Sequence, residues 1–344
     1  MTHATGKLSG RARSPSFELL GRDHSGENLK VSLVIPVFNE EEAVTVFIDQ
    51  VDEIFRPHPQ LDLELLFVND GSLDATLDRL VERQQDDPRI RIVDLSRNFG
   101  KEAALSAGLA IASGQVVVPM DVDLQDPPEL VLTMIGKWRD GYDVVLARRI
   151  DRGSDAWSKR TSAKWFYRVH NMIAKPSIPE NVGDFRLMDR MVIDVLMDFP
   201  ESRRFMKGLF AWLGFKTTCV DYVRAPRVVG QSKWDGWKLW NLAIEGITSF
   251  STVPLRIWSY IGFIIAAGAI AYGSIVATRA LIYGIEVPGY ASIFFAVSIL
   301  SGVQLLGIGI LGEYIGRIYM EAKRRPVYLI RQVIEPKRAI EASE

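Results

Sequence analysis

Two aspartates and a glutamine after an apolar segment are the side chains best suited to chemistry in this chain. The valine-rich residues 115–120 predict a buried strand, and Asp121, Asp123 and Gln125 follow it directly. Two carboxylates and an amide at a strand end are hard-oxygen ligands of the kind that Mg²⁺ or Mn²⁺ shares with substrate phosphates. The same residues also fit a solvated acidic turn, because Asp-x-Asp alone is a short motif.

Polar clusters after neighbouring strands favour the metal site over the acidic turn. Apolar segments predict further strands at residues 31–37, 63–68, 89–95 and 143–147, and polar clusters follow at 39–42, 69–72 and 97–101. Helical segments lie between the strands, with Asn39 as the predicted N-cap of the first and with the second starting at Ser72 to Asp74. This alternation predicts an α/β fold with a mainly parallel sheet, which binds ligands beyond the carboxyl ends of its strands. The clusters all lie at those ends, so the sequence predicts a nucleotide and metal site.

Composition narrows the class of protein. The 344 residues leave room for one large domain and something smaller, and the net charge of -1 gives no basic field that would indicate nucleic acid as a partner. The single cysteine, Cys219, has no partner for an intrachain disulfide, which fits a reducing compartment. Residues 1–29 show no periodicity and no signal-peptide core, and they predict a mobile tail.

Two apolar segments near the C-terminus predict membrane-spanning helices. Residues 257–283 and 290–312 are each long enough to cross a bilayer at about 1.5 Å per residue. Tryptophans within residues 229–256 predict interfacial helices, although tryptophans at this spacing also occur in cores. The basic cluster Lys323 to Arg325 predicts that the C-terminal segment 313–344 is cytoplasmic, and an even number of spans then places the domain at 30–228 on the same side. We therefore expect a multi-pass protein of the lipid bilayer.

The α/β alternation fades between residues 157 and 190, where basic and aromatic residues mix. Asp184 and Arg186 lie at the end of this region. By composition alone, a structural ion pair is a slightly better interpretation of them than a role in the site.

The strand-end motifs, taken in order, resemble those of the family 2 glycosyltransferases with the GT-A fold. These motifs span residues 36–40, 69–72, 97–101 and 121–125. Residues 182–188, 236–242, 246–252 and 311–317 narrow the resemblance to the polyprenyl-phosphate glycosyltransferases, a group that includes dolichol-phosphate mannose synthase, and within it to the bacterial bactoprenol glucosyltransferases. The resemblance runs from about Lys30 to Arg331, and Asn69 stands where the wider family commonly has aspartate.

This resemblance implies transfer of glucose from UDP-glucose to undecaprenyl phosphate in the bacterial inner membrane, for O-antigen or cell-envelope glycosylation. It implies inversion to a β-linked product, Mg²⁺ or Mn²⁺ as cofactor, and a homo-oligomer, a tetramer. The implied nucleotide-binding residues are Pro36, Phe38, Glu40, Asp70, Lys101 and Asp121, with Asp70 on the uracil edge. The implied metal site is Asp121, Asp123 and Gln125, and the implied catalytic residues are Asp123, Asp184 as a base, and Arg148 and Arg186 at the phosphates.

Several alternatives stay open at this point. The acceptor phosphate has a second pKa near 6 and is mostly dianionic at neutral pH, so Asp184 could position the acceptor instead of acting as a base. A relative that transfers mannose or an amino-arabinose derivative would keep nearly every motif. A processive polysaccharide synthase is disfavoured, because the chain lacks a Gln-x-x-Arg-Trp motif. A non-enzymatic lipid carrier is disfavoured by the intact Asp121, Asp123 and Asp184.

Overall fold

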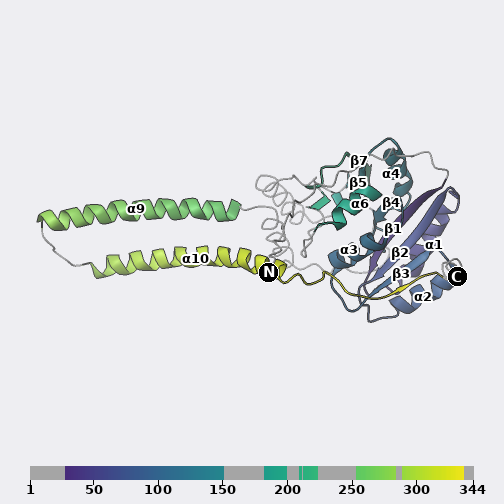
Figure 1. The fold of residues 1–344 in the computed structure, drawn as a ribbon, viewed down its shortest axis with the longest axis horizontal. Coiled ribbons are helices and arrows are strands. Elements are labelled where there is room, and N and C mark those ends of the chain that lie inside the picture. Colours follow the sequence, from purple (N-terminus) through teal and green to yellow (C-terminus); the bar gives the residue numbers. More distant parts are fainter. Residues whose placement is uncertain are drawn as a thin grey trace, which may run out of the picture.

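A computed structural model describes residues 28–150, 182–199, 209–210, 212–223, 253–283 and 289–336. They form an α/β domain around an eight-stranded sheet, and two long helices extend from it (Figure 1). The predicted N-terminal tail, most of the region at 157–190 and the tryptophans before the first apolar helix lie outside the described residues.

The sheet has the order β7-β5-β6-β4-β1-β2-β3-β8. Its centre is the parallel set β4, β1, β2 and β3, and β5 and β7 are parallel to each other. Among the described strands, β6 and β8 alone run antiparallel to their neighbours. The strand bounds are Leu29–Val37 (β1), Leu61–Asn69 (β2), Ile90–Leu95 (β3), Val116–Pro119 (β4), Val144–Arg149 (β5), Val182–Asp189 (β6), Thr217–Tyr222 (β7) and Ile330–Ile334 (β8). The predicted α/β fold with a mainly parallel sheet is confirmed.

Helices cover both faces of the sheet, so alternate residues of the central strands enter two different cores. Leu33 and Leu65 face the helices α1, α2 and α4, whereas Val34 and Leu66 face α3 and α6. A parallel sheet that is buried on both faces needs nearly continuous apolar strands, which is why these strands were readable from the sequence. The helix bounds are Ala43–Phe55 (α1), Thr76–Asp86 (α2), Lys101–Ile111 (α3), Leu130–Arg139 (α4) and Arg190–Met197 (α6).

The prediction of Asn39 as a helix N-cap is wrong. Helix α1 begins only at Ala43, and Asn39 has a left-handed backbone with a φ of 54°. Asparagine tolerates this conformation better than most residues. Its Oδ1 accepts a hydrogen bond from the Leu73 N–H at 2.8 Å, and its own N–H donates to Ser72 Oγ at 3.0 Å. Asn39 therefore joins the loop after β1 to the loop after β2. Helix α2 also begins later than predicted, at Thr76.

The sequence does not predict β6, β7 or β8. Each carries at least one charged residue, and β8 has only five residues, so none shows the continuous apolar pattern of the central strands. Strand β8 is an edge strand, where exposed charged side chains are common.

Helices α9 (Val253–Tyr283) and α10 (Tyr290–Ala322) lie side by side and contain the two predicted apolar segments (Figure 1). Helix α10 continues past residue 312, where the second segment is predicted to end. Residues 257–283 and 299–322 within them are long and apolar enough to cross a membrane. A side chain on Gly307 of α10 would overlap the indole of Trp258 on α9, so glycine is needed for this close helix contact. Their length and composition fit membrane association.

Candidate active site

The predicted site residues come together at the carboxyl edge of the parallel strands. Because β6 is antiparallel to β4 and β5, its first residues lie at this same edge. The edge thus carries residues that follow β1 (Phe38, Glu40), β2 (Asp70), β3 (Lys101) and β4 (Asp121, Asp123, Gln125), the end of β5 (Arg148) and the start of β6 (Asp184, Arg186). Pro36 is the second-last residue of β1.

Lys101 lies between two carboxylates that come from different strands. Its Nζ is 2.7 Å from Asp121 Oδ1 and 3.2 Å from Asp184 Oδ2. Burial alone would lower the pKa of Lys101, but the charges of Asp121 and Asp184 outweigh burial and raise it above its usual value. Lys101 therefore keeps its positive charge and links the end of β4 to the start of β6 through two ion pairs.

The turn after β4 presents oxygen ligands that suit a hard divalent ion. Asp121 forms an ion pair with Lys101. Asp123 Oδ1 accepts a hydrogen bond from the Gln125 N–H at 3.2 Å. Within the described residues, no group of three or more His, Cys, Asp or Glu side chains forms a closed metal cage. A divalent ion at Asp121 and Asp123 would therefore draw further ligands from a bound diphosphate, as Mg²⁺ commonly does.

Leu124, inside this turn, has a left-handed backbone with a φ of 54° although it is buried and not glycine. This conformation is uncommon for a leucine and carries strain. The strained residue lies directly between Asp123 and Gln125, so the surrounding structure holds the carboxylate turn in a fixed shape.

Asp70 fixes the loop after β3 against the end of β2. Its Oδ1 accepts from the Phe99 N–H at 2.7 Å and its Oδ2 from the Gly100 N–H at 2.9 Å. Burial raises the pKa of Asp70, and these two N–H groups offset part of that effect. Gly71 has a φ of 67°, and a Cβ there would meet the backbone of Arg97 and Asn98, so this turn requires glycine.

The two predicted phosphate-binding arginines contact protein groups in this structure. Arg148 Nε lies 2.6 Å from Asp221 Oδ1 in a half-exposed ion pair between β5 and β7. The buried Arg186 donates to the backbone oxygen of Gly183 at 2.6 Å and stacks on the Phe210 ring at 4.0 Å. Burial lowers the pKa of Arg186 to about 10, although Asp184 opposes this shift. Their roles at the phosphates stay predictions.

Arg149 is a site residue that the sequence analysis missed. Its Nε donates to Tyr222 Oη at 3.0 Å, and Tyr222 Oη in turn donates to the buried Asp126. Its Nη2 lies 3.4 Å from the position that a Cβ on Gly183 would take, next to Asp184. Burial alone would lower the pKa of Arg149, but Tyr222, Asp126 and Asp121 outweigh it and raise the pKa. Adjacent strand residues point to opposite faces, and the sequence alone does not say which of Arg148 and Arg149 faces the site.

The sequence of this chain is similar to those of known proteins. A model of the glycosyl transferase family 2 matches residues 32–197. The prophage bactoprenol glucosyl transferase homolog of Escherichia coli K12 is 51% identical over 305 residues, which cover 89% of this chain and 99% of that protein. The bactoprenol glucosyl transferase of Shigella phage SfV is 53% identical over 303 residues, 88% of this chain and 98% of that protein.

Among solved structures, glucosyl-3-phosphoglycerate synthase from Mycobacterium tuberculosis in complex with Mn²⁺, UDP and phosphoglyceric acid is similar with a TM-score of 0.45 and 22% identity. The match covers 64% of this chain and 76% of that one, and it is too distant to bear on chemistry.

Loss of either turn carboxylate should weaken metal binding. We expect Asp121→Asn and Asp123→Asn each to weaken Mn²⁺ binding in the presence of UDP by about tenfold or more, or at least ~1.4 kcal/mol. Electron paramagnetic resonance of free Mn²⁺ with the full-length protein measures this. Asp221→Asn is the matched control, since Asp221 pairs with Arg148 on the sheet surface and should bind as the wild type does. Equal binding by all three variants would exclude this turn as the metal site.

Proposed function

This chain belongs to glycosyl transferase family 2, and from that premise we propose that it transfers glucose from UDP-glucose to undecaprenyl phosphate. The observation that carries the proposal is identity of about half the residues to proteins named bactoprenol glucosyl transferase, over 88–89% of this chain. That match is longer than the catalytic domain, so it includes apolar helix sequence. The chain is then a membrane-bound hexosyltransferase.

The donor fits the polar carboxyl edge of the sheet. We assign the uridine to Pro36, Phe38, Glu40 and Asp70. The diphosphate then lies at Asp121 and Asp123 with Mg²⁺ or Mn²⁺, and Gln125 completes the protein ligands. When bound, the divalent ion offsets the charge that develops on the UDP leaving group.

Two cations of the chain itself lie beside that diphosphate. Lys101 is the first residue of α3, where the N–H groups of the first turn also favour an anion. Arg149 is held by Tyr222 close to Gly183, and the charge of Asp121 is among those that raise the pKa of Arg149. We therefore propose Arg149, in place of Arg148, for the role at the phosphates that the family resemblance implied.

The acceptor phosphate supplies its own nucleophile. One of its oxygens forms a bond to C1 of glucose while the bond from C1 to the UDP oxygen breaks, which inverts C1 and gives a β-linked product. The second pKa of a phosphate monoester is near 6, so this oxygen needs no strong base at neutral pH. Asp184 forms an ion pair with Lys101 at 3.2 Å, and that contact supports a positioning role.

The apolar helices suit an acceptor whose long chain stays in the bilayer. The basic residues 323–325 follow α10, and they support a domain on the cytoplasmic side of the bacterial inner membrane. Gly302 and Gly309 are exposed on α10, and small residues let the helix of another protomer pack closely there. We therefore include a homo-tetramer in the proposal.

A panel of labelled nucleotide sugars tests the reaction and the orientation together. Inside-out membrane vesicles with undecaprenyl phosphate should pass label from UDP-glucose into lipid, and EDTA should stop the transfer until Mg²⁺ or Mn²⁺ is restored. Right-side-out vesicles should not use the added donor, because a charged nucleotide sugar does not cross the membrane. Label from a mannose or amino-arabinose donor but not from UDP-glucose would assign another sugar. If no donor passed label into lipid, the proposed glycosyltransferase activity would be rejected.

Two adjacent arginines provide a matched pair. Arg149→Met should lower kcat/KM for UDP-glucose by about 10²-fold or more, because a charged hydrogen bond to the phosphates is lost. Arg148→Met removes a half-exposed ion pair with Asp221 and should cost less than about threefold. Steady-state rates of the two purified variants make the comparison. The reverse order would return the phosphate role to Arg148.

The pH dependence of Asp184→Asn separates a base from a positioning group. Positioning predicts a modest loss of kcat, with the rate still following the acceptor phosphate near pH 6. A base predicts loss of the limb of the pH–rate profile that reports the proton acceptor. With both substrates saturating, a loss of several orders of magnitude at every pH and unchanged acceptor binding would defeat positioning. Near-normal turnover of Asp184→Asn above neutral pH would exclude Asp184 as a general base.

A further inference from the structure

The chain returns from the membrane-type helices to complete the catalytic sheet. Helix α10 ends at Ala322, and β8 then pairs antiparallel with β3, from Ile330 beside Leu95 to Ile334 beside Ile92 (Figure 1). The Ser96 N–H donates to the Leu329 backbone oxygen at 2.9 Å. Leu95 is the carboxyl end of β3, so β8 begins at the edge of the sheet that carries the candidate active site.

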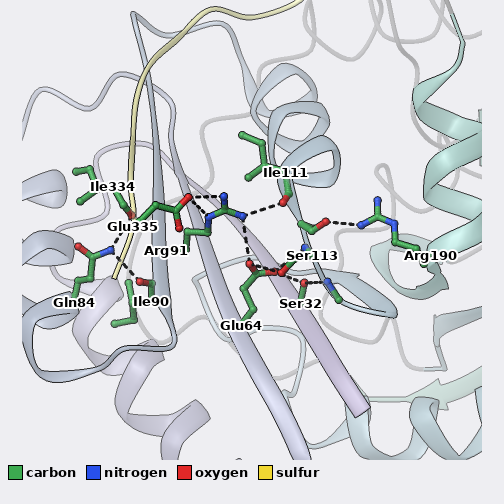
Figure 2. Close-up of polar contacts among 12 residues, drawn as sticks. Ser32, Glu64, Gln84, Ile90, Arg91, Ile111, Ser113, Arg190, Ile334 and Glu335 are labelled. Carbon is green, nitrogen blue, oxygen red and sulfur yellow. Dashed lines mark hydrogen bonds and ion pairs between the residues drawn. The ribbon is translucent and has the colours of Figure 1, made fainter. Parts of the chain in front are cut away.

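The far end of β8 is held away from that site. Gln84 Nε2 donates to the Ile334 backbone oxygen at 2.9 Å, and Arg91 Nη2 lies 2.5 Å from Glu335 Oε1 (Figure 2). Arg91 also lies 3.5 Å from the buried Glu64, near the amino ends of the strands. These contacts fasten the strand without reaching the donor site.

The near end of β8 connects to the donor site through buried polar groups. Arg331 Nη1 lies 3.2 Å from Asp94 Oδ2, and Asp94 is fully buried on β3. Asp94 Oδ1 accepts a hydrogen bond from Asn69 Nδ2 on β2 at 2.7 Å. Asn69 Oδ1 then accepts from the Ser72 N–H at 3.2 Å. These contacts form a relay from Arg331 to the turn at residues 69–72, which contains Asp70.

The charges explain why this relay sets the geometry of the turn. A buried carboxylate without a compensating cation is costly, and Arg331 supplies the cation for Asp94. Because both oxygens of Asp94 accept hydrogen bonds, one from Arg331 and one from Asn69, Asn69 directs its NH₂ group at Asp94 and its Oδ1 at the Ser72 N–H. An aspartate at position 69 would place two carboxylates against each other, which gives a physical reason for asparagine here.

We propose that Arg331 is a positioning residue of the nucleotide site, which acts through Asp94 and Asn69 on the turn that carries Asp70. Nucleotide binding then depends on a strand that follows both apolar helices in the chain, more than 230 residues from its partner in β3. This inference rests on the proposed function, because it takes UDP as the ligand at Asp70.

Calorimetric titration of the full-length protein with UDP and Mn²⁺ tests the relay. Arg331→Met should weaken UDP binding by about tenfold, whereas Glu335→Gln should change it by less than about twofold. Glu335→Gln is the matched control, since it loosens the far end of the same strand and leaves Asp94 paired with Arg331. An equal loss of UDP affinity in both variants would mean that β8 only stabilises the sheet, which would overturn the proposal. Unchanged UDP affinity in Arg331→Met would overturn it as well.

A rescue variant separates positioning from general damage. Asp94→Asn in the Arg331→Met background removes the charge that needs a cation, and the new amide oxygen can still accept from Asn69. We expect UDP affinity to return to within about threefold of wild type. Affinity as weak as that of Arg331→Met alone would refute the relay, and the rescue variant keeps the test decisive where Arg331→Met does not fold. Failure of the wild type to bind UDP would reject the proposed function instead.

Discussion

Attraction between one lysine and two carboxylates determines how this site is arranged. Strands β4 and β6 run in opposite directions, and their adjacent ends bring Asp121 and Asp184 to the same place, where like charges repel. Lys101 offsets that repulsion from the start of α3. The flanking loops have fixed shapes, since the surrounding structure holds Leu124 in a strained conformation and the turn at Gly71 packs closely against the backbone of Arg97 and Asn98. A divalent ion with a diphosphate would enter a site that is already built to hold positive charge.

The strands that precede α9 and follow α10 in the chain, β7 and β8, both reach this edge of the sheet. Strand β7 ends there at Tyr222, before the segment that leads to α9, and β8 begins there after α10. The candidate active site, the end of β7 and the start of β8 therefore lie at one edge of the sheet. For the proposed acceptor with a long apolar chain, this arrangement would bring the reacting phosphate and the donor to the same edge of the domain.

The sequence predicted what depends on continuous apolar strands and on polar residues directly after them. Strands β1 to β5 and the carboxylates at 121 and 123 follow that rule, so the convergence of Asp70, Lys101 and Asp121 could be foreseen. The choice between Arg148 and Arg149 could not, because it depends on which face of β5 points to the site. Nor could β8, because a five-residue charged strand is recognisable only by its partner β3, far away in the chain.

Asn69 shows how a small departure from a family pattern acquires a physical meaning only in the fold. From the sequence it is a substitution with little consequence. In the structure its amide donates to Asp94 and accepts from Ser72, which an aspartate could not do without a second buried charge. The side chain of Asn69, next to the proposed nucleotide-binding residue Asp70, is thus oriented by a residue 25 positions later in the chain.

The most direct test of the central claim is an experimental structure of the full-length protein with UDP and Mn²⁺, with the ion located by its anomalous scattering. Our account predicts the Mn²⁺ peak between the carboxylates of Asp121 and Asp123. It also predicts uridine beside Asp70, and Lys101 Nζ shifted from Asp121 toward the diphosphate. A Mn²⁺ peak elsewhere, or uridine bound away from the carboxyl edge of the sheet, would contradict it.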